Sequence, residues 1–132
     1  MNNGDKLTGK IKKYCPDSMK CTLVMKDHTD FKWDKVYIIK EGVSLEETNK
    51  IIRFNYPYFE DIADRIIFVK GNQVVYHQDE FINPSSTEKE RVLFKYPNDS
   101  KNYMVFSNDV VFKLIKSKVN TTSYYELESM NH

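Results

Sequence analysis

The sequence predicts an α+β protein in which a mainly antiparallel β-sheet carries one principal helix packed on one face. Ser44 is followed three residues later by Glu47, the spacing of a capping box, which marks the start of a helix. Downstream, the apolar runs 65–70 and 73–77 flank Gly71-Asn72, two residues that tolerate a positive φ and therefore predict a tight β-hairpin. A helix followed by a hairpin and by further short strands is typical of the α+β class.

Two strands, preceded by a short edge strand or an ordered arm, are expected ahead of this helix. Residues 6–14 are basic with scattered apolar side chains, and we expect a short edge strand or an ordered arm there. Residues 21–25 are β-branched and apolar, which indicates a strand. Residues 31–39 predict a strand with one buried face, because its large apolar side chains mostly share one parity. These side chains are Phe31, Trp33, Tyr37 and Ile39.

The helix is expected to run from about Leu45 to Phe54 and to pack on the sheet. Its inward face would carry Leu45, Thr48, Ile51 and Ile52. Pro57 ends the helical region, since the residue before a proline is pushed away from helical dihedrals. Burial of the three aliphatic side chains would contribute about 5 to 8 kcal/mol before conformational entropy is counted.

After the hairpin, three further short strands are expected in residues 91–96, 103–106 and 110–118. Residues 119–132 show no periodic pattern and are interpreted as a tail, although Tyr124 and Tyr125 are large enough to dock on the body. The 132 residues therefore predict a single domain, 1–132, with its core in about 15–118.

Composition excludes several function classes. The chain is 40% hydrophobic and 14% aromatic, which is too apolar for a disordered protein. Its 20 basic and 19 acidic residues are mixed in both halves, which argues against nucleic-acid binding, because that requires clustered Lys and Arg. No apolar run reaches the roughly 18 residues of a membrane span.

The location of the protein stays open at this point. Met1 is followed by polar residues and not by an apolar signal segment, so the chain as written predicts a soluble protein. If an export signal was removed, the periplasm or cell envelope is expected, and otherwise the cytoplasm.

Cys15 and Cys21 are the two cysteines, and they flank a Pro-Asp-Ser turn signal. We predict a disulfide between them, which would stabilise the fold by about 2 to 3 kcal/mol in the chain-entropy model. A disulfide requires an oxidising compartment, and two unlinked thiols in a cytosolic protein remain the alternative.

Signals for chemistry are sparse. The three histidines, His28, His77 and His132, share no metal-ligand spacing, so neither a metal nor another cofactor is expected. No nucleophile elbow or phosphate-binding glycine loop occurs, and no catalytic residue is predicted. His77 with Asp79 and Glu80 could form a general base with a carboxylate partner, whereas an outward polar residue on a hairpin strand is the simpler interpretation.

Aromatic and acidic residues give the stronger functional signal. Tyr56, Tyr58 and Phe59 surround Pro57, and interfaces favour large aromatic anchors with polar neighbours. The predicted partner-binding residues are Tyr56, Tyr58, Phe59, Glu60, Asp61, Asp79 and Glu80. The alternatives are a small core that closes the junction between helix and strand, and acidic side chains that are merely solvated.

Trp33 and Asp34 form an adjacent aromatic and acidic pair. The indole of Trp33 is expected to anchor the core. Asp34 is expected either to point outward from its strand or to pair with the neighbouring lysines.

The motif Phe31-Lys32-Trp33-Asp34-Lys35 and the hairpin 65–76 resemble small, largely uncharacterised bacterial exported proteins and lipoproteins. The resemblance covers roughly residues 15–118 and includes the paired cysteines ahead of the strand. It implies a bacterial, non-enzymatic, envelope-associated domain similar to immunity proteins, and it supplies no catalytic residues. The chain lacks a lipid-acceptor cysteine near its start, so a lipid anchor would belong to a full-length precursor.

The function expected from the sequence is that of a non-enzymatic bacterial binding protein of the immunity or inhibitor type. It would block a partner toxin or enzyme through a charged and aromatic surface. The alternative is a small hydrolase or nuclease that uses His77 with Asp79 and Glu80.

Overall fold

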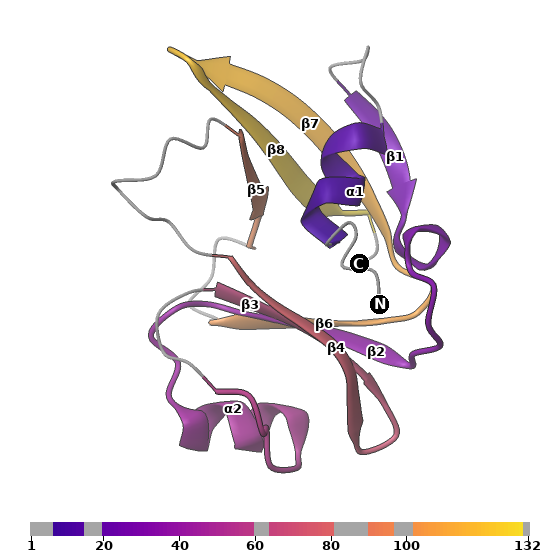
Figure 1. Ribbon diagram of the computed structural model, residues 1–132, viewed down its shortest axis with the longest axis vertical. Coiled ribbons are helices and arrows are strands. Elements are labelled where there is room, and N and C mark those ends of the chain that lie inside the picture. Colours follow the sequence, from indigo (N-terminus) through magenta and orange to yellow (C-terminus); the bar gives the residue numbers. More distant parts are fainter. Residues whose placement is uncertain (1–6, 15–19, 60–63, 81–89, 97–101, 131–132) are drawn as a thin grey trace. The chain divides into compact units, whose positions relative to one another are not determined.

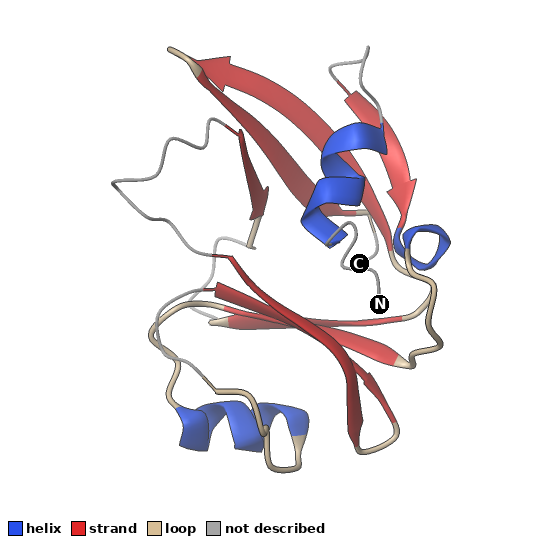
Figure 2. Cartoon of the chain, in the orientation of Figure 1, coloured by secondary structure: helices blue, strands red, loops and turns tan. Residues whose placement is uncertain are grey.

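Two four-stranded sheets and two α-helices make up the part of the chain that the computed structural model describes (Figures 1 and 2). The described residues are 7–14, 20–59, 64–80, 90–96 and 102–130. The predicted α+β class with mainly antiparallel strands is confirmed, but the strands form two sheets where one was expected. The chain divides into two compact units, one of residues 1–30, 85–95 and 109–132, the other of residues 31–84 and 96–108.

The first unit is a mixed sheet in the order β1-β7-β8-β5. β7 pairs antiparallel with β1 and β8, and β5 pairs parallel with β8. The unit contains α1 (Leu7–Tyr14), β1 (Lys20–Val24), the 3₁₀ helix η1 (Met25–His28), β5 (Glu90–Phe94), β7 (Val111–Val119) and β8 (Thr122–Ser129). Its buried side chains include Leu23, Phe112, Leu114 and Leu127.

Of the two N-terminal alternatives, the edge strand was wrong, because residues 7–14 form the helix α1. Leu7 and Ile11 are buried, and their spacing of four residues places them on one face of a helix. The spacing of Leu7 and Ile11 was present in the sequence. It covers only two helical turns and lies among scattered lysines, so it was too weak a pattern to predict a helix.

The C-terminal prediction also needs correction, because residues 119–132 contain the strand β8. Asn120 adopts a positive φ of 57° and begins a two-residue turn that pairs Val119 with Thr122. Tyr125 and Leu127 alternate into the core. The core therefore extends beyond 15–118 at both ends. Only two inward apolar residues mark β8, and the pairing with β7 supplies the rest of its stability.

The second unit is an antiparallel sheet in the order β4-β3-β2-β6, with α2 along one face (Figure 1). Its elements are β2 (Lys35–Ile39), α2 (Leu45–Ile52), β3 (Asp64–Lys70), β4 (Gln73–Glu80) and β6 (Tyr103–Ser107). The predicted hairpin is confirmed: Lys70 pairs with Gln73, and Gly71 has a φ of 60°. A positive φ at this position is what a tight hairpin turn requires.

The helix α2 begins where the sequence predicts. The backbone N–H of Glu47 donates to the Ser44 Oγ at 3.1 Å, which is one half of the expected capping box. The helix ends at Ile52, because Arg53 adopts the left-handed conformation with a φ of 73°. Thr48 and Ile52 are buried as expected, whereas Leu45, in the first turn, is 40% exposed and does not belong to the packed face.

The strand expected over 31–39 is shorter and more deeply buried than predicted. β2 begins at Lys35, and Val36, Tyr37, Ile38 and Ile39 are all buried, so both of its faces are covered. β3 and β6 pair with its two edges, and Tyr37 and Ile39 are buried in the cluster that includes Ile52 of α2. Ahead of it, Trp33 and Phe31 pack edge-on against Phe68, at ring-centroid distances of 4.8 and 5.3 Å.

Asp34 has a role that neither expectation described. Its carboxylate Oδ2 accepts a hydrogen bond of 2.7 Å from the backbone N–H of Gly71, at the tip of the β3–β4 hairpin. Its own N–H donates to the Val69 carbonyl at 2.7 Å. Trp33 is buried as predicted. The Trp-Asp pair therefore joins the entry of β2 to a turn 37 residues further along the chain.

The predicted Cys15–Cys21 disulfide stays a prediction, because Cys15 lies outside the described residues. Cys21 lies in β1 opposite Leu114 of β7.

Replacing Asp34 with Ala should lower the free energy of unfolding by about 1 kcal/mol, because the Gly71 amide loses its charged acceptor. Urea denaturation followed by tryptophan fluorescence measures this change. Asp30→Ala is the control, since Asp30 is also an exposed acidic residue near the same segment. Equal stability of the two variants would show that the hydrogen bond between Asp34 and Gly71 does not stabilise the fold.

His28 should make the stability of the first unit depend on pH. Burial of the imidazole, which lies edge-on to Tyr14 at 4.4 Å, lowers the pKa of His28 below its ordinary value of 6.5; nearby Lys10 lowers it further and Asp27 opposes the shift. The unfolded chain then binds the proton more tightly. Stability is therefore retained above pH 6.5 and lost as the pH falls through that value and the folded-state pKa.

Chemical denaturation between pH 7.5 and 4.5 tests this expectation. His28→Phe keeps an aromatic ring against Tyr14 and should have a shallower loss of stability than the wild type. Parallel pH profiles would show that His28 does not contribute.

Candidate functional site

The candidate site begins at the C-terminal end of α2, where the chain leaves the helix for β3. The left-handed conformation of Arg53 turns the chain, and the Asn49 side-chain Oδ1 accepts a 2.8 Å hydrogen bond from the backbone N–H of Tyr56. Tyr56 is only 3% exposed and packs in the core cluster with Ile52 and Ile67. The helix thus holds the loop that follows it against the sheet.

Three rings, Tyr56, Tyr58 and His77, form what we call the aromatic stack. The Tyr58 ring lies parallel to the His77 imidazole, with centroids 4.2 Å apart and planes inclined by 11°. Tyr56 is edge-on to both, at 5.9 Å from Tyr58 and 6.1 Å from His77. His77 lies opposite Ile67 in the β3–β4 pairing, which places it on the α2 side of the sheet. Tyr58 is nevertheless 49% exposed.

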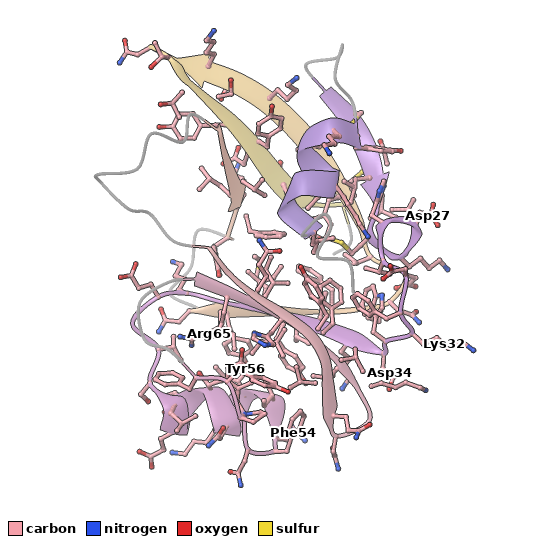
Figure 3. All side chains as sticks on the ribbon, viewed as in Figure 1. Asp27, Lys32, Asp34, Phe54, Tyr56 and Arg65 are labelled. Atoms are coloured by element: carbon pink, nitrogen blue, oxygen red, sulfur yellow. The ribbon has the colours of Figure 1, made fainter. Side chains whose placement is uncertain are left out.

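A buried arginine lies on the same side of the sheet. Arg65 of β3 is 0% exposed, and its guanidinium Cζ is 4.7 Å from the centroid of the Phe59 ring. Its Nη1 donates to the Thr48 Oγ1 of α2 at 3.4 Å. Figure 3 shows Arg65 and Tyr56 on the α2 side of the sheet. The Arg65 guanidinium therefore contacts both α2, through Thr48, and Phe59, the residue that follows Tyr58.

The structure brings together part of the predicted partner-binding set. Tyr58 is exposed and Phe59 is half-buried, whereas Tyr56 is a core residue, as the alternative of a small junction core requires. Glu60 and Asp61 lie outside the described residues. The backbones of Asp79 and Glu80 form the end of β4, opposite Arg65 and Asp64.

Two members of the site were missed from the sequence. Arg65 shares the parity of Ile67 and Val69, the inward residues of β3, and this parity was the available signal for a buried arginine. Thr48 was assigned to the inward face of the helix, but not as a hydrogen-bond acceptor. His77 was interpreted either as a catalytic base or, more simply, as an outward polar residue of a hairpin strand, whereas its ring packs against Tyr58.

Neither a metal-binding cluster nor a membrane-spanning helix is found among the described residues. No group of three or more His, Cys, Asp or Glu side chains in the described residues is placed to hold a metal ion. Nor is either described α-helix long and apolar enough to cross a membrane.

No protein-family model, curated protein or solved structure matches this chain. The resemblance to bacterial exported proteins therefore stays a prediction.

Replacing Asn49 with Ala should accelerate hydrogen exchange of the Tyr56 amide about tenfold, because that amide loses its side-chain acceptor. Exchange measured residue by residue by NMR reports this directly. Lys50→Ala changes the adjacent, exposed position of α2 and should leave the Tyr56 amide unaffected. Similar exchange rates in both variants would show that Asn49 does not hold the loop.

Proposed function

We propose that this protein is a non-enzymatic binding protein of the immunity or inhibitor type. It blocks a partner toxin or enzyme by presenting the surface around Tyr58. The observation that carries the proposal is the aromatic stack, in which a half-exposed tyrosine is held from beneath by His77 and from the side by Tyr56.

A tyrosine in this setting has the properties of an interface anchor. Its ring offers a large apolar surface with a polar tip, and such residues dominate binding energy at protein interfaces. Because Tyr58 already packs on His77, it gives up less rotational freedom on binding than an unsupported side chain would. A preformed anchor of this kind suits steric blockade of a partner.

The acidic residues of the predicted set support a basic partner. Glu60 and Asp61 follow Tyr58 by two and three residues, and Asp79 and Glu80 follow His77 by the same intervals. Acidic groups near an aromatic anchor attract a positively charged surface and raise the association rate. We therefore expect binding to weaken as salt concentration rises.

The product of the gene next to this one is the partner to test first. Titration calorimetry should show binding, and Tyr58→Ala should weaken it by about 30-fold or more, which corresponds to loss of a hot-spot residue. Tyr14→Ala is a closely matched control, because Tyr14 is 43% exposed and also contacts a histidine, His28. The control variant should bind like the wild type.

Equal affinities of the Tyr58→Ala and wild-type proteins would contradict the proposal. So would an enzymatic activity that depends on His77. The wild type and the double variant His77→Ala, Asp79→Ala are therefore assayed on esters, phosphates and glycans. Turnover by the wild type that the double variant lacks would support a hydrolase or nuclease instead.

A further inference from the structure

We infer that Arg65 is the positioning residue of this surface: from the interior, it sets the conformation of the loop that presents Tyr58. The consequence for binding rests on the proposed function, whereas the conformational claim can be tested on the isolated protein. Arg65 itself is fully buried and so does not reach a partner.

Two contacts of Arg65 involve residues on either side of Tyr58 in the sequence. Thr48, which accepts the hydrogen bond from Nη1, lies in α2 before the loop. Phe59, whose ring lies under the guanidinium, follows Tyr58 directly. The segment that carries Tyr58 is therefore bounded at each end by an interaction with the same side chain, which is itself fixed in β3.

These two contacts require a guanidinium. Its flat face packs on an aromatic ring while its N–H groups donate in the plane, a combination that a lysine ammonium cannot reproduce.

Arg65 lies on a face of β3 whose other described inward residues are apolar. The other inward residues of β3, Ile67 and Val69, are aliphatic and pack in the core cluster. Methionine is a flexible apolar side chain that fills irregular core space, so Arg65→Met removes the charge and the N–H donors without leaving a large cavity. Arg65→Met should therefore preserve the sheet and α2 while it releases Phe59, and with it Tyr58.

Nuclear Overhauser effects between the Tyr58 and His77 rings, normalised to those within the Ile52–Ile67 core, measure the stack in the isolated protein. Arg65→Met should reduce them at least threefold while amide protection in α2 persists. Arg65→Lys, which keeps the charge, should give an intermediate value. Arg53→Met is the matched control, because it makes the same change at an exposed arginine at the start of the loop.

Phe59→Leu gives a second route that leaves the buried cation in place. It removes the ring beneath the guanidinium at a half-buried position and should also weaken the Tyr58–His77 effects. An unchanged Tyr58–His77 stack in a folded Arg65→Met variant overturns the inference. If Arg65→Met does not fold, an unchanged stack in Phe59→Leu overturns it instead.

Binding to the partner separates this inference from the proposed function. Arg65→Met should weaken binding by about two- to tenfold, the effect of having to order one or two side chains. If Tyr58→Ala weakens binding and the ring contacts survive in Arg65→Met, the inference alone fails. If the ring contacts are lost in Arg65→Met but Tyr58→Ala binds normally, the proposed function alone fails.

Discussion

The second unit depends on the packing of α2 against β2 and β3. Ile52 from the helix, Tyr37 and Ile39 from β2, and Ile67 and Val69 from β3 form one buried cluster that Tyr56 and Val43 extend. Removal of this apolar surface from water is the main favourable term for such a helix, because eight residues are too few to be helical in isolation. Residues 53–59, which follow the helix, are attached to this layer because Tyr56 is buried in it and Phe59 packs against it.

Polar contacts between distant segments add the precision that hydrophobic packing lacks. Asp34 fixes the tip of the β3–β4 hairpin, Asn49 holds the backbone of Tyr56, and Arg65 contacts both Thr48 and Phe59. Apolar contacts are non-directional, so the cluster alone would tolerate several positions of the loop. Hydrogen bonds and a guanidinium–ring contact have narrow geometric requirements and select one of them.

Tyr58 combines an exposed ring with a fixed position, which an ordinary exposed tyrosine lacks. Its ring is nearly half exposed, and yet it is stacked on a histidine that projects from a β-strand. Tyr14 has similar exposure but meets its histidine only edge-on, at the last residue of a short helix. A stacked ring supported by a sheet is the better anchor for a protein partner, which is the basis of the proposed function.

Local signals in the sequence were sufficient for the helix cap at Ser44, the hairpin at Gly71 and most strands after it. Each of these depends on residues close together in the chain, where propensity and turn geometry act directly. The helix α1 and the strand β8 were misassigned, because each shows only two inward apolar residues and takes its stability from the sheet of the first unit.

For the site, the sequence by itself determined that Tyr56, Tyr58 and Phe59 lie together, since they are neighbours in the chain. Only the tertiary structure decided which of them is buried, that His77 supports Tyr58, and that the Arg65 guanidinium lies over the Phe59 ring. The physical reason is that these contacts join segments whose approach is set by strand register and helix packing, and neither is encoded in local composition.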